Sequence, residues 1–272
     1  MLIKVTENVY VENGMVACNV GFLVTKQGVV VIDTPMRPTD IMKFRDEASK
    51  KGEIRYVINT EEHPDHWQGS YFFPGLLITH QETRNRLMPA KPEEVLERVK
   101  QMDPEGVTLM KGYKVRLADI TFDENLTIHL GDHTIKLFHL PGHSPGGIGV
   151  YIPEERVVFT TDIVFHKWKS WLHESEPTKW LASLKKLESL NAAVIVPGHG
   201  DICPRNYLQE EATIVSRWVE LVKSAIQKGQ SEEEAAATIV CPDPHPKQPG
   251  TPMTPEQLNR AIISRLYQLC KN

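Results

Sequence analysis

Four side chains able to bind a metal ion fall within six residues of one another: Glu61, His63, Asp65 and His66, in the stretch "NTEEHPDHWQGS". Imidazole nitrogens and carboxylate oxygens spaced so closely are typical ligands of one or two divalent cations. The apolar run at 54–59 precedes them and is expected to form a strand. A polar loop rich in Glu, His and Asp is the simpler alternative, so a metal site requires further ligands elsewhere in the chain.

Three other positions offer such ligands. His143 in "PGHS" and His199 in "PGHG" each lie in a Pro/Gly turn after a strand-like run. Asp162 lies inside the apolar run "VVFTTDIVF", where a carboxylate is costly unless it is paired or metal-bound. Each residue alone is weak evidence, because a lone histidine in a turn is more often solvated or hydrogen-bonded. Ligand sites in α/β sheets form beyond the carboxyl ends of strands, however, so we expect these groups to converge.

Taken in order, the stretches "EEHPDH", "PGHS", "TTD" and "PGHG" resemble the metallo-β-lactamase superfamily. Its pattern is an HxHxDH motif, then a histidine in a Gly/Pro turn, an aspartate ending a strand, and a late histidine. The stretch "VIDTP", with Asp33, also resembles an early strand end of that family. The resemblance spans about residues 5–205. It implies an α/β fold, a four-layer αββα sandwich with the metal ions at one edge.

The resemblance also implies two groups of ligands for two divalent cations, most simply zinc, with one carboxylate bridging them. The ligands carried over are Glu61, His63 and His143 for one metal ion, Asp65, His66 and His199 for the second, and Asp162 as the bridge. One position departs from the family pattern: Glu61 stands where the family usually has a histidine.

Glu61 changes the expected chemistry of the first metal ion. A carboxylate adds negative charge and a harder oxygen donor, so manganese or iron becomes possible beside zinc, and the Lewis acidity of the metal falls. Three alternatives stay open: Glu61 turns away and leaves the first position weak or empty, Glu62 replaces it, or the site has lost its function. Diiron relatives of the superfamily also carry a glutamate in this motif, but one place later, where His63 stands here.

The function that the resemblance implies is metal-dependent hydrolysis, in which a metal-bound hydroxide attacks a small ester, thioester, lactone or lactam, with weak β-lactamase activity possible. Asp65 would then be both a ligand and the catalytic residue that orients the hydroxide. The sequence contains no GxSxG motif that would indicate a serine hydrolase. An iron-containing oxidoreductase of the same fold and a non-catalytic metal-binding protein are the alternatives. The chain has no motif for the flavin domain that normally accompanies the diiron type.

Residues after Asp162 are candidates for the substrate cleft. The stretch "DIVFHKWKSWLHE" supplies His166, Trp168, Trp171 and His173. The alternative is that the tryptophans pack the edge of the sandwich. His245 lies in a proline-rich stretch, 241–252, and we do not expect it to reach the site.

Composition narrows the possible partners. The chain has 272 residues, a formal net charge of −4 and 24% charged residues, without a Lys/Arg run, which disfavours a nucleic-acid binder. It shows no apolar run of membrane-span length and no signal-peptide pattern at its start, so we expect a cytoplasmic protein acting on a small molecule. Its four cysteines are widely separated and are interpreted as incidental thiols.

Periodicity predicts the elements that position these residues. Strands are expected at 21–24, 28–33, 54–59, 147–152, 156–165 and 193–200, with a hairpin at 125–139. Helices are expected at 39–52, with Thr39 or Asp40 as the N-cap, and at 178–190 and 206–228. Residues 1–205 form the metallo-β-lactamase-like domain, and residues 206–272 form a helical extension packed on it. The apolar stripe at 206–228 could pack inward or form a dimer, which leaves the oligomeric state open.

Overall fold

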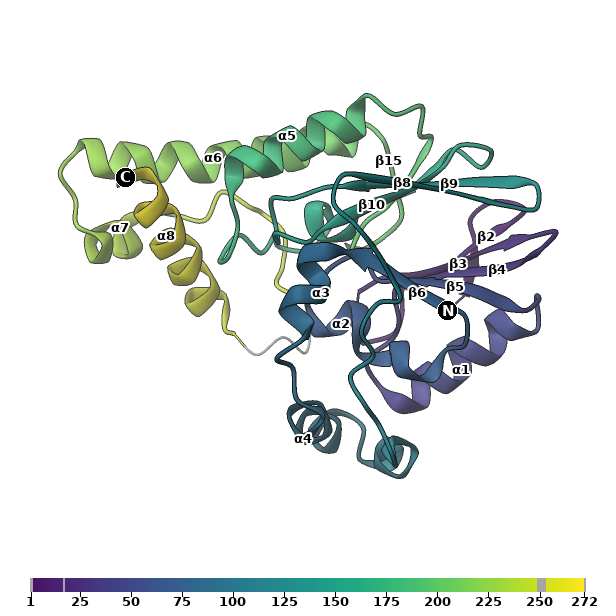
Figure 1. Ribbon diagram of the computed structural model, residues 1–272. Coiled ribbons are helices and arrows are strands. Elements are labelled where there is room, and N and C mark those ends of the chain that lie inside the picture. Colours follow the sequence, from purple (N-terminus) through teal and green to yellow (C-terminus); the bar gives the residue numbers. More distant parts are fainter. Residues whose placement is uncertain (1, 17, 249–252, 272) are drawn as a thin grey trace.

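The computed structural model describes residues 2–16, 18–248 and 253–271, and within them two β-sheets pack face to face with helices on the outside (Figure 1). The first sheet has the order β1-β2-β3-β4-β5-β6-β7. Its strands are β1 (Leu2–Lys4), β2 (Val9–Glu12), β3 (Val20–Thr25), β4 (Gly28–Ile32), β5 (Ile54–Ile58), β6 (Leu76–His80) and β7 (Ile120–Phe122). Strands β1 to β4 run antiparallel to their neighbours, and β4 to β7 are parallel.

The second sheet has the order β15-β13-β11-β10-β9-β8. Its strands are β8 (Asn125–Leu130), β9 (His133–His139), β10 (Ile148–Ile152), β11 (Val157–Phe159), β13 (Val194–Val196) and β15 (Cys203–Pro204). The predicted hairpin is confirmed by the antiparallel pairing of β8 with β9. A short parallel pair, β12 (Phe165–His166) with β14 (His199–Gly200), lies beyond the strand ends. The two mixed sheets and their helical cover confirm the expected αββα sandwich.

Alternating side chains of one central strand show how the layers are held. Val30 and Ile32 of β4 point between the sheets, whereas Val29 and Val31 point toward the helical layer, and all four are fully buried. A strand buried on both faces reads as a continuous apolar run, as this one does. Full burial of each such side chain contributes about 1.5–3 kcal/mol relative to exposure. The rigid sheets therefore fix where their carboxyl ends, and the residues just beyond them, lie.

Helices cover both outer faces. The first sheet carries α1 (Pro38–Ser49), and its edge loops hold α2 (Pro64–Trp67), α3 (Gln81–Leu87) and α4 (Pro92–Met102), while α5 (Pro177–Glu188) covers the second sheet. Short 3-10 turns span Gln68–Phe72, Pro104–Met110 and Thr161–Ile163. Helix α1 begins at Pro38 with Arg37 as its N-cap, so the predicted N-cap at Thr39 or Asp40 was wrong by two or three residues. Proline favours the first helical turn, and the Thr39 hydroxyl instead donates to Asp103 Oδ2 at 3.0 Å.

The chain ends in three helices, α6 (Tyr207–Gln227), α7 (Glu232–Thr238) and α8 (Pro255–Lys271). The apolar stripe of α6 packs inward, with Trp218 and Val222 buried in the same cluster as Leu184 of α5 and Ile262 of α8. The helical extension therefore shares its core with the outer face of the second sheet. Residues 249–252 of the proline-rich stretch lie outside the described residues. No helix in the described ranges has the length and apolarity needed to cross a membrane.

One predicted strand is broken. The run 156–165 was expected to continue through Asp162, but β11 ends at Phe159 and a 3-10 turn follows at Thr161–Ile163. Gly198 explains the break, because its backbone N–H donates to the carbonyls of Thr161 and Val164, at 2.8 and 3.1 Å, and pulls the chain into a turn. Asp162 therefore lies just beyond the strand end and not within the strand.

Candidate metal centre

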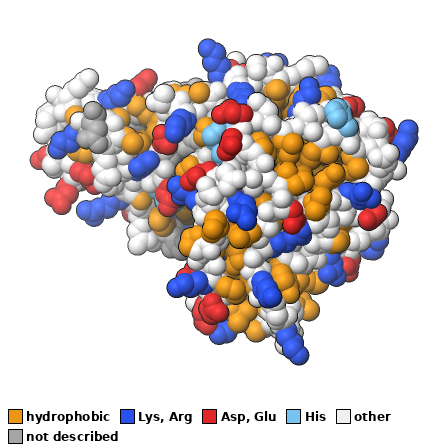
Figure 2. Space-filling model, in the orientation of Figure 1, with side chains coloured by type: hydrophobic (Ala, Val, Ile, Leu, Met, Phe, Trp, Pro, Cys, Tyr) orange, Lys and Arg blue, Asp and Glu red, His pale blue; other side chains and the backbone are white. Residues whose placement is uncertain are grey.

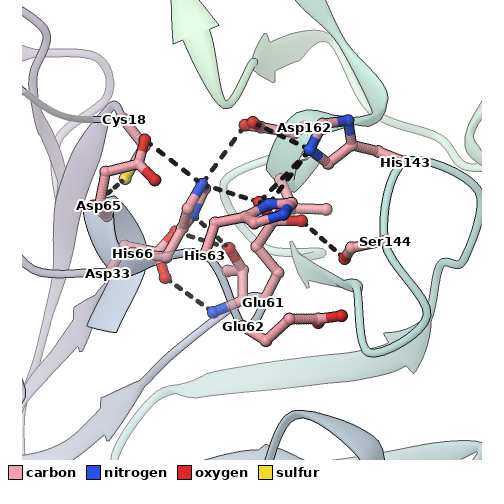
Figure 3. A network of polar contacts seen from close by, with 12 residues as sticks. Cys18, Asp33, Glu61, Glu62, His63, Asp65, His66, His143, Ser144 and Asp162 are labelled. Carbon is pink, nitrogen blue, oxygen red and sulfur yellow. Dashed lines mark hydrogen bonds and ion pairs between the residues drawn. The ribbon is translucent and has the colours of Figure 1, made fainter. Parts of the chain in front are cut away.

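The seven predicted ligands lie together at one edge of the sandwich, and Figure 3 shows all of them except His199 with labels. The first sheet contributes the segment after β5, which holds Glu61 and His63 and then forms α2 with Asp65 and His66. The second sheet contributes residues from turns beyond its strands: His143 after β9, Asp162 after β11 and His199 in β14. Residues from position 61 to position 199 thus converge because both sheets place these strand ends at the same edge.

The local sequence explains how the segment after β5 bends toward the site. Strand β5 ends at Ile58, and Pro64 begins the single turn of α2 with His63 as its N-cap. The Asn59 side chain donates to the carbonyl oxygen of His66 at 2.9 Å and closes the loop. Across the site, a Cβ added at Gly198 would overlap Asp162 Oδ1, so the close approach of these two turns requires glycine there.

One group of candidate ligands is Asp65, His66 and His199. His199 Nε2 lies 3.3 Å from Asp65 Oδ2, and His66 Nε2 lies 4.0 Å from the same oxygen. The outer nitrogen of His66, Nδ1, lies 3.0 Å from Asp33 Oδ2 and 3.1 Å from Thr60 Oγ1. Such a contact fixes the ring orientation and directs Nε2 into the site.

The other group is Glu61, His63 and His143, joined by Asp162. Glu61 Oε1 lies 2.7 Å from His63 Nδ1 and 3.8 Å from His143 Nε2. The second oxygen of Glu61, Oε2, accepts a hydrogen bond from Ser144 Oγ at 2.7 Å. His143 Nδ1 lies 3.0 Å from the carbonyl oxygen of Trp171, so that nitrogen donates outward and Nε2 faces the centre.

Asp162 lies between the two groups. Its Oδ1 is 3.4 Å from His66 Nε2, and its Oδ2 is 3.5 Å from His143 Nε2 and 3.2 Å from His199 Nε2. One carboxylate thus faces histidines of both groups, which is the position that a bridging ligand needs. Glu61 Oε1 also reaches across, at 3.1 Å from His66 Nε2.

The donor spacing fits a metal ion. A tetrahedral cation with bonds of about 2.0–2.1 Å separates its ligand atoms by about 3.3–3.4 Å, and the distances within the two groups, from 2.7 to 4.0 Å, lie on both sides of this value. Two buried atoms that face the centre, His66 Nε2 and Asp162 Oδ1, make no hydrogen bond among the described residues. Buried polar atoms without a partner are rare and costly, so these two fit atoms that bind a cation.

Opposed charges hold these side chains without any cation. Burial disfavours a charged imidazolium, but the carboxylates of Asp162 and Asp65 outweigh it and raise the pKa of His199 to about 10. Burial likewise opposes the charged form of His63, whose pKa is nevertheless well above its usual value because of Glu61. These two imidazoles therefore carry protons at neutral pH, whereas burial lowers the pKa of His143, so a cation that binds His63 and His199 must displace their protons.

Glu62 does not compete for the site. Its side chain points away from the centre (Figure 3), and its Oε2 accepts hydrogen bonds from Gly146 N at 3.2 Å and Thr83 Oγ1 at 3.4 Å. Its Oε1 lies 3.5 Å from Arg86 Nε. The two adjacent glutamates thus differ: Glu61 faces the histidines, and Glu62 anchors the neighbouring loop.

A cavity of about 650 Å³ opens onto the candidate ligands. Of the side chains predicted for the substrate cleft, Trp171 and His173 line this cavity, whereas His166 and Trp168 are not among its lining residues. His166 turns aside because its Nδ1 lies 2.8 Å from the carbonyl oxygen of Asp201 and its ring packs on Tyr207. His245 stays away from the centre, as expected, at 2.9 Å from Asp243 Oδ1, although Gln248 of the same stretch reaches the cavity wall.

Several residues around the centre were not assigned a role from the sequence. Ser144 follows His143 directly, and Asp33 ends an early strand, so both stood in recognised motifs without an indication of what they contact. The Trp171 carbonyl is a backbone group and has no sequence signal. The contribution of α4 to the cavity wall, through Arg98, Gln101 and Met102, had none either.

Comparison with known proteins places this chain in a family and matches its fold to solved structures. The family model described as "Metallo-beta-lactamase superfamily" matches residues 13–199. A metallo-beta-lactamase type 2 from Elizabethkingia meningoseptica is 26% identical over 237 residues, covering 82% of this chain and 87% of the relative. A hydroxyacylglutathione hydrolase from Mesorhizobium japonicum is 26% identical over 176 residues, covering 62% of this chain and 60% of the relative, so the match leaves much of that protein unaligned.

Solved structures agree with the fold. A metallo-beta-lactamase family protein from Thermus thermophilus matches with a TM-score of 0.70 at 15% identity, covering 98% of this chain and 94% of that one. A metallo-beta-lactamase from Pontibacter korlensis matches with a TM-score of 0.62 at 17% identity, covering 79% of this chain and 98% of that one. The motifs, the sandwich and the family match together show that the chain belongs to the metallo-beta-lactamase superfamily.

Proposed function

We propose that this protein is a metal-dependent hydrolase whose seven clustered side chains bind two divalent cations, most simply zinc, and whose substrate is a small ester, thioester, lactone or lactam. The observation that carries the proposal is the placement of Asp162 between two groups that each offer two imidazoles and one carboxylate. The relatives that bear the names of hydrolases support the same reaction class. Bound divalent cations would supply an acidified water as the nucleophile and stabilise developing negative charge on the substrate.

The chain's own residues then have distinct tasks. Asp65 is the most exposed of the three carboxylates of the centre, with 22% of its side chain accessible at the cavity. Its Oδ2 faces His199, so its other oxygen is available to orient the attacking water and accept a proton. Glu61 is fully buried and held by Ser144, so it acts as a ligand and not as a proton acceptor. Trp171 lines the cavity beside the centre and packs against the substrate.

Charge distribution supports a small-molecule substrate. Lys/Arg and Asp/Glu side chains are interspersed over the face shown in Figure 2, without a continuous basic area, and the net charge is −4. A protein that tracks a nucleic-acid backbone usually presents a basic stripe. A cavity of about 650 Å³ is of the size that encloses a small molecule.

Glu61 favours one alternative, an iron-containing oxidoreductase of the same fold. Two imidazoles and one carboxylate in each group form the donor set that also binds non-haem iron. Iron content with visible absorption, together with oxygen or persulfide reduction and no hydrolysis, would support it. Metal binding without turnover of any substrate class would instead support a non-catalytic metal-binding protein.

The test begins with protein freed of metal by chelation and reloaded with zinc, manganese or ferrous iron. Hydrolysis of activated esters, thioesters, lactones and lactams is measured for each form. The neighbouring glutamates supply a matched pair of variants: Glu61→Gln should weaken metal binding and hydrolysis, whereas Glu62→Gln should leave both close to wild type. Equal effects of the two substitutions would contradict the assignment of Glu61, and absence of hydrolysis in every metal form would contradict the proposed function.

A further inference from the structure

Helix α4 also lines the cavity that opens onto the candidate metal centre. It supplies Arg98, and the cavity lining also includes Met36, Met102 and Trp171. Among the residues that line the cavity, Arg98 is the one whose side chain is positively charged at every pH of interest. The cavity therefore combines apolar side chains with one permanent positive charge.

A buried amide fixes the position of Arg98. Arg98 Nη1 donates to Gln68 Oε1 at 2.7 Å, and Gln68 Nε2 donates to the carbonyl oxygen of Met36 at 2.9 Å. Gln68 is 1% exposed, so its amide cannot turn toward water and its oxygen stays directed at the guanidinium. One of the five N–H donors of Arg98 is thereby used, and the rest of the planar group is available to a ligand.

No carboxylate of the described residues forms an ion pair with Arg98, in contrast to Arg86 and Arg116. Arg86 Nε lies 3.2 Å from Glu82 Oε1, and Arg116 Nη2 lies 2.9 Å from Asp119 Oδ2. The exposed carboxylate at the cavity, Glu174, faces His63 Nε2 at 3.7 Å. An arginine that is positioned by a neutral amide and lacks an acidic partner is well suited to bind an anion from outside the protein.

Resting on the proposed function, we infer that Arg98 binds a carboxylate of the substrate, and that the substrate is an ester or thioester of a small acid carrying a second, anionic end. The reactive carbonyl faces Asp65 and Asp162, the carboxylate pairs with the guanidinium fork, and the apolar chain between them lies against Met36 and Met102. A planar carboxylate matches the paired N–H groups of one arginine. Arg98 is thus a specificity-determining residue.

The first experiment compares two thioesters of one thiol in metal-loaded protein: an ω-carboxyacyl thioester and the neutral acyl thioester with the same number of carbons. A second matched pair of thioesters carries the carboxylate on the thiol instead of on the acyl group. It tests the opposite orientation of the substrate in the cavity. Wild type should prefer the anionic member of at least one pair. Arg98→Gln should lower kcat/KM for that substrate about 10- to 100-fold, mainly through KM, as expected for loss of a charge-assisted hydrogen bond. Turnover of the neutral member should stay within about threefold.

Two control variants separate binding from folding. Arg217→Gln removes an exposed arginine of α6, 59% of whose side chain is accessible, and should change neither substrate. Arg98→Lys keeps the positive charge but loses the paired N–H donors of the guanidinium. It should recover part of the preference for the anionic substrate that Arg98→Gln loses. Equal losses on the anionic and neutral substrates of Arg98→Gln, or no loss on either, would overturn the inference.

Calorimetry distinguishes failure of this inference from failure of the proposed function. Glutarate and valerate are titrated into metal-loaded wild type and Arg98→Gln, and the advantage of the dicarboxylate should be present in wild type and absent in the variant. If that result appears without turnover of any ester, thioester, lactone or lactam, the anion site stands and the hydrolase proposal fails. If thioesters are hydrolysed but the dicarboxylate has no Arg98-dependent advantage, the hydrolase proposal stands and the anion site is overturned.

Discussion

The two ligand groups contain the same kinds of donor but lie in different surroundings. Glu61, His63 and His143 match Asp65, His66 and His199 as two imidazoles with one carboxylate, because Glu61 replaces the histidine usual in the family. His66, however, is fully buried and held by Asp33, whereas 26% of the His63 side chain is exposed at the cavity. Any difference in affinity between the two positions must therefore come from how firmly the ligands are held.

The residues that hold the ligands of the two groups also come from different parts of the chain. Asp33 and Thr60, at the ends of β4 and β5, hold His66 from within the rigid first sheet. Ser144 and the Trp171 carbonyl, both in loops, hold Glu61 and His143. Preorganised ligands lose less conformational freedom on binding, so we expect the group containing His66 to take up the first metal ion.

The largest effect should follow removal of the shared carboxylate. Asp162→Ala deletes the side chain that faces both groups, so both metal ions should bind more weakly and kcat/KM should fall at least about 10³-fold, as for the loss of a central catalytic group. Elemental analysis and a hydrolysis assay measure the two outcomes. Retention of two metal ions and wild-type turnover would show that Asp162 is not the bridge.

A smaller and selective effect is expected from Asp33→Asn. The substitution keeps the shape but removes the charge that orients His66, and loss of such an outer partner typically costs about 10- to 100-fold in metal affinity. Affinity of the group containing His66 should fall by about this factor while the other group changes little. Stepwise metal titration separates the two constants, and an equal loss at both positions would remove the distinction between them.

Ser144→Ala should act on the other group. Freeing Glu61 Oε2 removes a buried hydrogen bond worth about 1 kcal/mol, so affinity at that position should fall about fivefold. Stepwise metal titration of Ser144→Ala measures this loss, and Asp33→Asn serves as the comparison because it should weaken the other position. A loss confined to the position of His66 would reverse our assignment of Glu61.

The weakest effect on metal binding is expected from Glu211→Gln in α6, but it should change the pH dependence of stability. Glu211 accepts hydrogen bonds from Ser170 Oγ at 2.7 Å and Phe165 N at 3.2 Å, in the segment that leads to Trp171. Burial raises the pKa of Glu211 to about 8, from 4.5 when unfolded. Between these values the folded state keeps a proton that the unfolded state has lost.

The free energy of unfolding should therefore decline as pH rises through this window, by about 1.4 kcal/mol per pH unit from this group. Glu211→Gln should flatten the decline and leave the variant relatively more stable near pH 9. Urea unfolding of metal-free protein from pH 5 to 9 measures this pH dependence of the free energy of unfolding. Glu210→Gln, on the exposed side of α6, is the control. Identical slopes for wild type and Glu211→Gln would contradict the raised pKa.

Side-chain type and order were enough to predict the fold and to single out the residues that converge at the centre. Each ligand follows a strand end, and strand ends meet at one edge whatever the loops do. The groups that hold the ligands in place were not predictable in the same way. Ser144 contacts a residue 83 positions earlier in the chain, and His143 is held by a backbone carbonyl that any residue at 171 would supply.

The cavity wall was the hardest part to predict. Arg98 lies on an amphipathic helix, where an arginine is ordinarily a solvated surface residue, and its role depends on the buried Gln68. Asp162 was placed within a strand because the apolar residues on both sides of it read as one run. The Gly198 contact that breaks this run joins segments that are more than thirty residues apart.

The most direct test of the central claim is a titration of metal-free protein with Co²⁺, followed by visible absorption together with hydrolysis of an activated thioester. We predict uptake of two ions per chain in two steps, with the first step weakened by Asp33→Asn and the second by Ser144→Ala, and turnover that depends on bound metal. Saturation at a single ion, or no binding at all, would contradict a centre in which each of the two ligand groups binds one metal ion.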